Sequence, residues 1–310
     1  MDNSKVKVLY IAGEGRSGST ILGSLLGEIS GFLFVGELMS IWKHFYIENN
    51  ACTCGTLPSE CSIWKQIIYE GFGHIDKQLA IKMEYYRRYY IKNRRIISFL
   101  HPNLQQSLYQ EASDYLNYLE LLYCSIKNVV NVDFIVDDPK NPTYGKLLEQ
   151  IPVIDLYVIH LIRDPRAVAY SWQRKKIQTD GKKNVRLMFQ FNPLVSAYRW
   201  NIHNLSTSLL LRTQPEKYYV QRYEDFVNNP KQAVENILKF LKITGKSLPF
   251  ESKDSVRLTG NHAVWGNPVR HLTGVIEIKN DDEWIKSFKG YNRRLVGLLT
   301  TPLRKKYGYK

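Results

Sequence analysis

The sequence contains no apolar run as long as the ~18 residues that a helix needs to span a membrane. The first strand pattern starts so near Met1 that a signal peptide has no room before it. We therefore expect a cytoplasmic protein without a transmembrane segment. Cysteine is scarce too: the 310 residues include four, and three of these fall in ACTCGTLPSEC, residues 51–61. In a reducing compartment such residues are expected to be thiols rather than a disulfide framework.

A zinc site is not expected at these cysteines. Tetrahedral zinc takes four ligands, and Cys52, Cys54 and Cys61 are accompanied by neither a second C-x-x-C nor a paired histidine. The sequence therefore predicts no bound metal and leaves the role of the three thiols open.

Negative charge is also in short supply. The chain has 43 Lys and Arg against 29 Asp and Glu, a formal net charge of +14. This excess favours acidic ligands. No helix-turn-helix, RNP or zinc-finger pattern accompanies it, so we expect a small phosphate-rich cofactor rather than a nucleic acid. The basic run YYRRYYIKNRR, residues 85–95, predicts an amphipathic helix with a solvated face, with contact to an acceptor or a membrane surface as the alternative.

One residue is missing from an otherwise familiar motif. Residues 6–20, VKVLYIAGEGRSGST, have the pattern of a buried strand, a glycine-rich turn and a helix. The spacing from Gly13 through Gly18 fits G-x-x-x-x-G-K-[ST], but Ser19 occupies the lysine position. Because that lysine contacts the β and γ phosphates, its absence argues against ATP or GTP. Backbone N–H groups and the helix N-terminus still suit an anion, with Arg16 as the nearby cation.

Strand patterns alternate with helical patterns along the chain and predict an α/β fold with a parallel sheet flanked by helices. The five strand patterns are residues 6–12, a segment from Phe32, and segments that end at Asp137, Ile162 and Tyr223. A region at about 63–130 has few glycines and apolar residues every three or four positions, which predicts a helical insertion. No repeat or linker divides the sequence, so we expect a single domain, 1–310.

A second anion site is predicted after the strand that ends at Ile162. The chain continues as RDPRAVAYSWQRKK, where Asp164 suits a helix cap and Pro165 the first helical position. Arg163 then falls at the carboxyl end of a strand, where ligands bind in such sheets. An ordinary capped helix with a basic end would have the same pattern. Together with the anion loop, the pattern favours a phosphate site that includes Ser171.

GEGRSGST and RDPRAVAYS together resemble the two cofactor signatures of sulfotransferases that use 3′-phosphoadenosine 5′-phosphosulfate, PAPS. The form GRSGST is closer to the bacterial, carbohydrate and protein-tyrosine branches, and the resemblance extends over about residues 5–284. It implies that the first loop holds the 5′-phosphosulfate, and that an arginine and a serine hold the 3′-phosphate. The residues to which these roles fall are Gly15, Arg16, Ser17, Gly18, Ser19 and Thr20 for the loop, and Arg163 and Ser171 for the 3′-phosphate.

Later segments extend the resemblance. QRYEDFVNNP is similar to a tyrosine-containing strand end of the family, and GNPVRHLTGVIEIKNDDEW is similar to its C-terminal loop in bacterial members. They imply cofactor contacts for Tyr223, Asn267 and Arg270. Trp200 and Trp265 are candidates for stacking on adenine or for lining the acceptor pocket. The alternative is that both are buried in the core, as tryptophans more often are.

The resemblance implies in-line transfer of a sulfuryl group from PAPS to an acceptor, most often a hydroxyl, without a metal ion and with PAP as the product. A general base is needed. Glu37, in VGEL, matches the glutamate that serves as the base in the protein-tyrosine branch. Glu37 could instead be a carboxylate that stabilises the start of a helix. His44 is the competing candidate for the base. Arg16 and the loop amides would stabilise the leaving group. Lys140 matches the lysine of a D-S-S-K type motif, although Asp138 and Pro139 replace its serines.

Two other functions stay open. A P-loop kinase or NTPase would use Asp137 or Asp138 to hold Mg²⁺, against which Ser19 argues. A non-catalytic nucleotide-binding module would bind the cofactor without turnover. The sequence does not identify the acceptor, which is a small molecule, a glycan, a lipid or a peptide, nor the oligomeric state.

Overall fold

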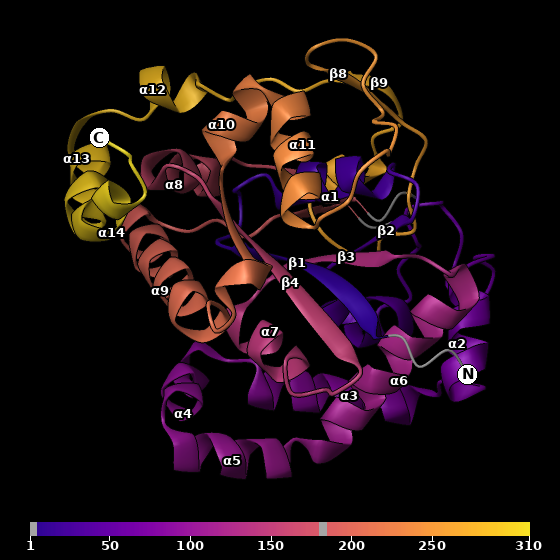
Figure 1. The fold of residues 1–310 in the computed structure, drawn as a ribbon. Coiled ribbons are helices and arrows are strands. Elements are labelled where there is room, and N and C mark those ends of the chain that lie inside the picture. Colours follow the sequence, from indigo (N-terminus) through magenta and orange to yellow (C-terminus); the bar gives the residue numbers. More distant parts are fainter. Residues whose placement is uncertain (1–4, 180–184) are drawn as a thin grey trace.

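A five-stranded parallel sheet forms the centre of the computed structural model, which describes residues 5–179 and 185–310 (Figure 1). The strand order is β2-β3-β1-β4-β7. The strands are β1 (Val6–Gly13), β2 (Phe32–Gly36), β3 (Phe134–Lys140), β4 (Ile154–Ile162) and β7 (Tyr218–Arg222). All five match the strand patterns of the sequence, so the predicted parallel α/β sheet is confirmed.

Both faces of the sheet are covered, which explains why its central strand is almost continuously apolar. In β1, Val8 and Tyr10 belong to one cluster of buried residues, while Leu9 and Ile11 belong to another. Alternate side chains of a strand point to opposite faces, so β1 contributes to both cores.

Helices provide both covering layers. One layer contains α1 (Ser19–Gly27), α10 (Tyr223–Asn228) and α11 (Pro230–Phe240), and the other contains α7 (Pro142–Leu148), α9 (Pro193–Leu211) and the insertion. The insertion comprises α2 (Trp64–Phe72), α3 (Lys77–Tyr90), α4 (Ile96–Leu100), α5 (Pro102–Glu111) and α6 (Ser113–Val130). The helical character predicted for residues 63–130 is thus confirmed, and Figure 1 shows these helices below the sheet.

The basic run at 85–95 does not form one helix. Helix α3 ends at Tyr90 inside the run, and a short 3₁₀ turn, Asn93–Arg95, follows. Within α3, Glu84 accepts charged hydrogen bonds from Arg87 at 2.6 Å and from Arg88 at 2.7 Å. The carboxylate of Glu84 therefore partly balances the positive charge of Arg87 and Arg88 on the same helix.

Two antiparallel hairpins complete the architecture, and the sequence patterns did not indicate either. They are β5 (Ile177–Thr179) with β6 (Val185–Leu187), and β8 (Ser255–Leu258) with β9 (Gly274–Glu277). The remaining helices are α8 (Pro165–Gln173), α12 (Glu283–Ser287), α13 (Gly290–Leu299) and α14 (Thr301–Lys306). Within the described ranges, no helix combines the length and apolar character needed to cross a bilayer.

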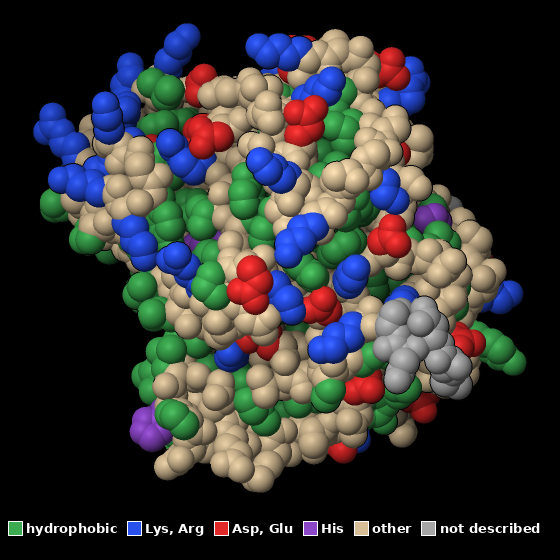
Figure 2. Space-filling view, in the orientation of Figure 1, with side chains coloured by type: hydrophobic (Ala, Val, Ile, Leu, Met, Phe, Trp, Pro, Cys, Tyr) green, Lys and Arg blue, Asp and Glu red, His purple; other side chains and the backbone are tan. Residues whose placement is uncertain are grey.

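Positive charge is spread widely. Figure 2 shows Lys and Arg side chains scattered among Asp and Glu over one face, with a concentration at the corner that α13 and α14 occupy in Figure 1. Lys289, Arg294 and Lys305 of this region are exposed. The net charge is therefore not confined to a single binding site.

Candidate functional site

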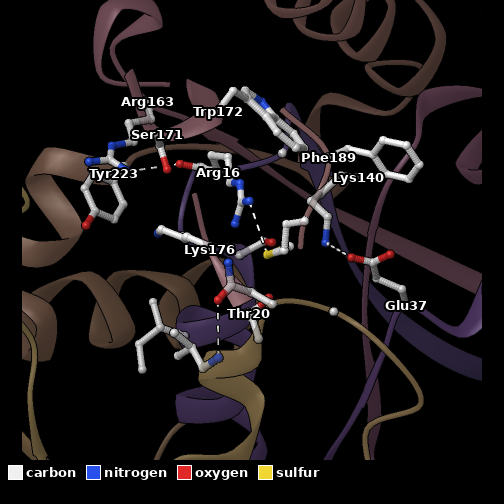
Figure 3. Close-up of a pocket in the computed structure, with 18 of the residues that line it drawn as sticks. Arg16, Thr20, Glu37, Lys140, Arg163, Ser171, Trp172, Lys176, Phe189 and Tyr223 are labelled. Carbon is white, nitrogen blue, oxygen red and sulfur yellow. Dashed lines mark hydrogen bonds and ion pairs between the residues drawn. The ribbon is translucent and has the colours of Figure 1, made fainter. Parts of the chain in front are cut away.

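A cavity of about 400 Å³ lies at the carboxyl ends of β1, β3 and β4 (Figure 3). Most of the site residues expected from the sequence line it: Gly15, Arg16, Gly18, Ser19, Thr20, Glu37, Lys140, Arg163, Ser171, Tyr223 and Asn267. Figure 3 shows Arg163, Ser171 and Tyr223 at one end, Glu37 and Lys140 at the other, and Arg16 between them. The tertiary structure thus brings these residues, from six separate segments of the chain, to one cavity.

The first loop has a backbone that requires glycine. Gly18 has φ 87° and immediately precedes α1, and a Cβ there would lie 2.6 Å from the Tyr223 ring. Arg16 and Lys140 also have positive φ, 68° and 64°. Such backbone strain in residues other than glycine is uncommon and is concentrated at functional sites. Two of the residues expected to be catalytic therefore sit in costly conformations.

Arg16 presents unused hydrogen-bond donors. Its guanidinium carbon lies 4.7 Å from the centre of the Trp172 ring, and Nη2 lies 3.3 Å from the sulfur of Met188. Its Nε and Nη1 are buried and have no hydrogen-bond partner among the described residues. Burial, with a smaller contribution from Arg174, lowers the pKa of Arg16 to about 10. An anion bound here would supply both the missing acceptor and the missing negative charge.

Arg163 ties the second predicted site to the first loop. It is buried, donates through Nη1 to the carbonyl oxygen of Arg16 at 3.1 Å and lies 3.3 Å from the Asp281 carboxylate. Its guanidinium carbon is 4.3 Å from the centre of the Tyr223 ring. Its Nε has no acceptor within the described part of the chain. Ser171, on α8, is buried beside it in the same cavity.

Glu37 and Lys140 form an ion pair at the opposite end. Lys140 Nζ lies 2.9 Å from Glu37 Oε1 and 3.1 Å from Asp138 Oδ2. Burial lowers the pKa of Lys140, but the carboxylates of Asp138 and Glu37 outweigh burial and raise it above its ordinary value. The ammonium group is therefore held charged, next to the carboxylate expected to be the base.

Asp138 has a role that the sequence did not reveal. It is fully buried, and its Oδ2 accepts hydrogen bonds from the hydroxyls of Ser19 at 2.9 Å and Thr20 at 3.2 Å. Burial raises the pKa of Asp138, against the opposing effect of Lys140. The neighbouring Asp137 points elsewhere, because it accepts from the Leu38 backbone N–H at 3.1 Å and from the Tyr123 hydroxyl. Asp138 thus links the first loop to Lys140.

Two expected cofactor contacts do not line the cavity. Ser17 is buried, and its hydroxyl lacks a hydrogen-bond partner among residues 5–179 and 185–310. Arg270 is 1% exposed, donates to the carbonyl oxygen of Gly266 at 2.6 Å and lies 4.9 Å from the centre of the Trp265 ring. Arg270 therefore supports the loop from behind, while Trp265 itself lines the cavity.

His44 and Trp200 lie outside the cavity lining. The His44 ring stacks on Trp265 at 3.6 Å between ring centres, and its Nδ1 lies 2.9 Å from the Glu48 carboxylate. Burial is the main cause that lowers the pKa of His44 to about 4. Trp200 is buried in the core and donates to the carbonyl oxygen of Arg163 at 2.9 Å.

Several lining residues were not among the site residues expected from the sequence, although Lys176 belongs to the basic end of the RDPRAVAYSWQRKK segment. Among the described residues they include Trp172, Lys176, Met188, Phe189, Phe191, Arg199 and Asp281. Burial, followed by the charges of Arg16 and Arg174, lowers the pKa of Lys176 to about 8. Phe189 is 84% exposed at the mouth of the cavity. The cavity therefore combines a cationic interior with an aromatic rim.

Comparisons with known proteins bear on the fold and the family of the chain. A search of curated proteins finds no match. The sulfotransferase domain from the curacin biosynthetic pathway is 17% identical, with 99% of each chain covered and a TM-score of 0.51. Sulfotransferase STF9 from Mycobacterium avium is 11% identical, with 98% of this chain and 78% of that chain covered and a TM-score of 0.52. These structures share the fold. The model of the sulfotransferase family matches residues 9–246, and the chain therefore belongs to the sulfotransferase family.

Proposed function

We propose that the protein transfers a sulfuryl group from PAPS to an acceptor hydroxyl, with Glu37 as the general base. The observation that carries the proposal is one cavity with cationic groups at separate positions and a carboxylate at its far end (Figure 3). Arg163 and Ser171 would hold the 3′-phosphate, and Arg16 with the first loop would hold the 5′-phosphosulfate. PAPS would supply the sulfuryl group and leave as PAP.

The free donors of the cavity fit such a ligand. Arg16 Nε and Nη1 and Arg163 Nε are buried without acceptors in the described residues. A buried donor that lacks a partner costs about 1–3 kcal/mol, and more when it is charged. The phosphate and sulfate oxygens of PAPS offer acceptors of the right charge. Burial, with a further contribution from nearby arginines, lowers the pKa values of Arg16 and Lys176, so a bound anion would stabilise the charged form of both groups.

Each catalytic group has a distinct task in this proposal. The Glu37 carboxylate takes the proton of the attacking hydroxyl. Lys140, 2.9 Å from Glu37, turns its ammonium group toward the sulfuryl oxygens or the leaving oxygen as negative charge builds there. The backbone N–H groups at the start of α1 and the Arg16 guanidinium stabilise the same charge. Asp138 orients Ser19, Thr20 and Lys140.

A magnesium-dependent kinase or NTPase fits less well. In such enzymes a carboxylate near the loop hydroxyl must be available to the metal ion or its water. Here Asp138 Oδ2 already receives two hydroxyls and lies 3.1 Å from Lys140 Nζ; Oδ1 has no partner among the described residues, but the nearby ammonium charge opposes a divalent cation there. A divalent cation would have to displace that ammonium group or bind beside it.

The rim favours an acceptor with an apolar or aromatic part. Phe189, Phe191 and Met188 line the cavity together with Trp172, and Figure 3 shows Phe189 on the same side as Lys140 and Glu37. A hydroxyl carried by an apolar group could bury that group against these side chains while reaching the carboxylate. Small molecules, lipids and tyrosine-containing peptides meet this description.

Ligand binding and turnover test the proposal together. PAP is expected to raise the melting temperature more than ATP with Mg²⁺ does. Incubation of the enzyme and PAPS with a metabolite extract should yield products heavier by one SO₃. A protein that is stabilised by ATP with Mg²⁺ and not by PAP would contradict the proposal.

Glu37→Gln isolates the base. Because the amide cannot accept the proton, the rate is expected to fall by about 10²- to 10⁴-fold while the Kd for PAP changes little. Glu70→Gln, an exposed change on α2, is the matched control and should leave both quantities unchanged. Turnover of Glu37→Gln at the wild-type rate would exclude Glu37 as the base.

A further inference from the structure

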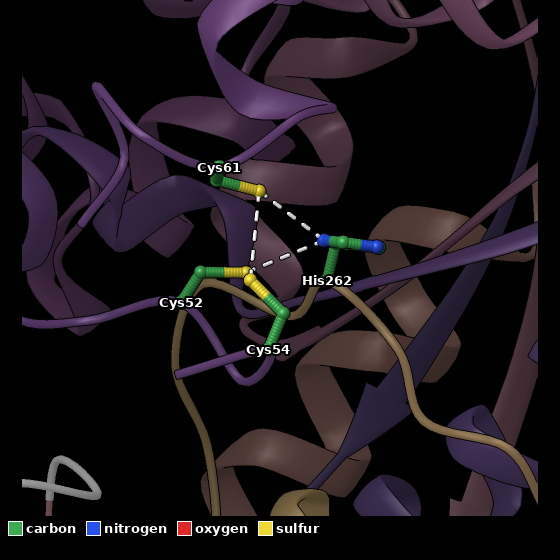
Figure 4. A group of neighbouring side chains, drawn as sticks. All are labelled: Cys52, Cys54, Cys61 and His262. Carbon is green, nitrogen blue, oxygen red and sulfur yellow. Dashed lines mark hydrogen bonds between the residues drawn. The ribbon is translucent and has the colours of Figure 1, made fainter. Parts of the chain in front are cut away.

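Four side chains with metal-binding atoms meet outside the lining of the cavity, and Figure 4 shows them together. The atoms are the sulfurs of Cys52, Cys54 and Cys61 and one nitrogen of His262, and all lie within 4.8 Å of one another. The histidine was missing from the sequence pattern because it lies 201 positions beyond Cys61. The fold therefore supplies the fourth ligand that the three cysteines lacked.

The spacing is close to that of a tetrahedron of ligands around zinc, although the distance from His262 Nδ1 to Cys61 Sγ is shorter. Zn–S bonds of about 2.3 Å and Zn–N bonds of about 2.0–2.1 Å place ligand atoms roughly 3.6–3.8 Å apart. Cys54 Sγ lies 3.7 Å from Cys61 Sγ, and His262 Nδ1 lies 3.7 Å from Cys52 Sγ and 3.2 Å from Cys61 Sγ. A disulfide would need the two sulfurs about 2.05 Å apart. The cluster thus has the dimensions of a metal site rather than of a cystine.

The segments that carry the ligands are fixed by other contacts. Gly55 has φ 86° and donates to the carbonyl oxygen of Cys52 at 2.8 Å, which turns the chain back directly after Cys54. Trp64 Nε1 donates to the carbonyl oxygen of His262 at 2.7 Å, and the Ala263 N–H donates to the Thr53 hydroxyl at 2.9 Å. These bonds hold the histidine loop against the cysteine loop, so the ligands are preorganised.

We propose that Cys52, Cys54, Cys61 and His262 bind one zinc ion in a closed, structural site. Three thiolates and one imidazole are a donor set of known structural zinc sites, and soft thiolates in a tetrahedral arrangement select zinc over magnesium or calcium. On binding, each thiol releases its proton, and His262 coordinates through an unprotonated Nδ1. All four positions are filled by the protein, which leaves no open position for a substrate.

The zinc ion would hold one wall of the cavity in place. Three residues after His262 comes Trp265, which lines the cavity, and its carbonyl oxygen accepts from the Glu37 N–H at 3.1 Å. Between them, the Val264 N–H donates to the carbonyl oxygen of Val35 at 2.8 Å. The ion would therefore join the cysteine loop to the loop that contacts the backbone of Glu37.

Metal analysis of the full chain tests the site directly. Protein purified without chelators and kept reduced is expected to contain one zinc per chain, released when the thiols are alkylated. The cobalt-substituted protein should show a thiolate-to-metal charge-transfer band and the visible bands of tetrahedral Co²⁺. Reduced wild-type protein that retains no zinc and binds neither zinc nor cobalt overturns the proposal. So does a Cys54–Cys61 disulfide in protein purified without oxidant.

Substitutions identify the ligands. Cys54→Ser and His262→Ala should lower the zinc content well below one per chain and lower Tm by about 5 °C or more. Cys124→Ser is the matched control, because Cys124 lies on α6 outside the cluster, and it should retain the metal. The cobalt spectrum of the wild type decides the question if a ligand variant fails to fold. Full zinc content in both ligand variants would refute the assignment.

Discussion

Replacing Arg163 with alanine separates the two ends of the proposed donor site. The guanidinium lies beside Ser171 and Tyr223 at one end of the cavity, while Arg16 of the first loop lies between that end and Glu37. PAP carries a 3′-phosphate, and AMP lacks it. Arg163→Ala should therefore weaken PAP binding strongly and AMP binding little.

The structure sets the size of the expected effect. The Arg163 side chain is only 6% exposed, so water replaces its charge poorly at this site. A hydrogen bond to a charged group in such surroundings contributes about 1.5–3 kcal/mol. This corresponds to a loss of about 10- to 150-fold in PAP affinity. AMP affinity should fall less than PAP affinity; some loss is expected for AMP too, because Arg163 Nη1 also donates to the carbonyl oxygen of Arg16 in the first loop.

Isothermal titration with PAP and AMP measures the four affinities. Arg166→Ala is the matched control: it removes an arginine three positions away that bonds to Asp164 at 2.6 Å and does not line the cavity. Its PAP affinity should equal that of the wild type. An equal loss for PAP and AMP in Arg163→Ala would refute the reasoning, because it would place Arg163 at the 5′ end or in the support of the loop.

Two further predictions concern charge and backbone. Burial and the charges of Arg16, Arg174 and Arg163 depress the pKa of Lys176 to about 8, with Asp281 opposing them. A bound phosphate should raise the pKa of Lys176, so PAP affinity should fall as the pH rises through 8 and be about tenfold lower at pH 9. Titrations of PAP binding from pH 7 to 9.5 measure this fall. Lys176→Met should abolish the pH dependence. Gly18→Ala places a methyl group 2.6 Å from the Tyr223 ring at φ 87°. This substitution should lower the free energy of unfolding by about 1–3 kcal/mol and abolish the melting-temperature increase caused by PAP. A Gly18→Ala variant with wild-type stability and a wild-type response to PAP would contradict the role of this turn.

The sequence was sufficient for the strands and for the backbone of the two loops expected to bind anions, because these features are local. The run from Val6 to Thr20 contains its own strand, turn and helix start, and the segment after Ile162 contains its own cap and first proline. Their joint position at one edge of the sheet follows from the rule that parallel strands end on the same side. The placement of Arg16 and Arg163 in one cavity was predictable for this reason.

Contacts between distant segments depended on the path of the loops, which no local pattern encodes. Asp138 meets Ser19 and Thr20 because β1 and β3 pair in parallel, with a shift in register between Tyr10 and Ala12, and Lys140 is paired with Glu37. His262 reaches the cysteines because the loop between β8 and β9 passes over β2. The amino-acid sequence thus determined the local strand, turn and helix start of these two loops through short-range backbone geometry. Tertiary packing decided which charged groups and which sulfur atoms lie close together. These groups are far apart along the chain, and that separation does not show whether they meet in the folded protein.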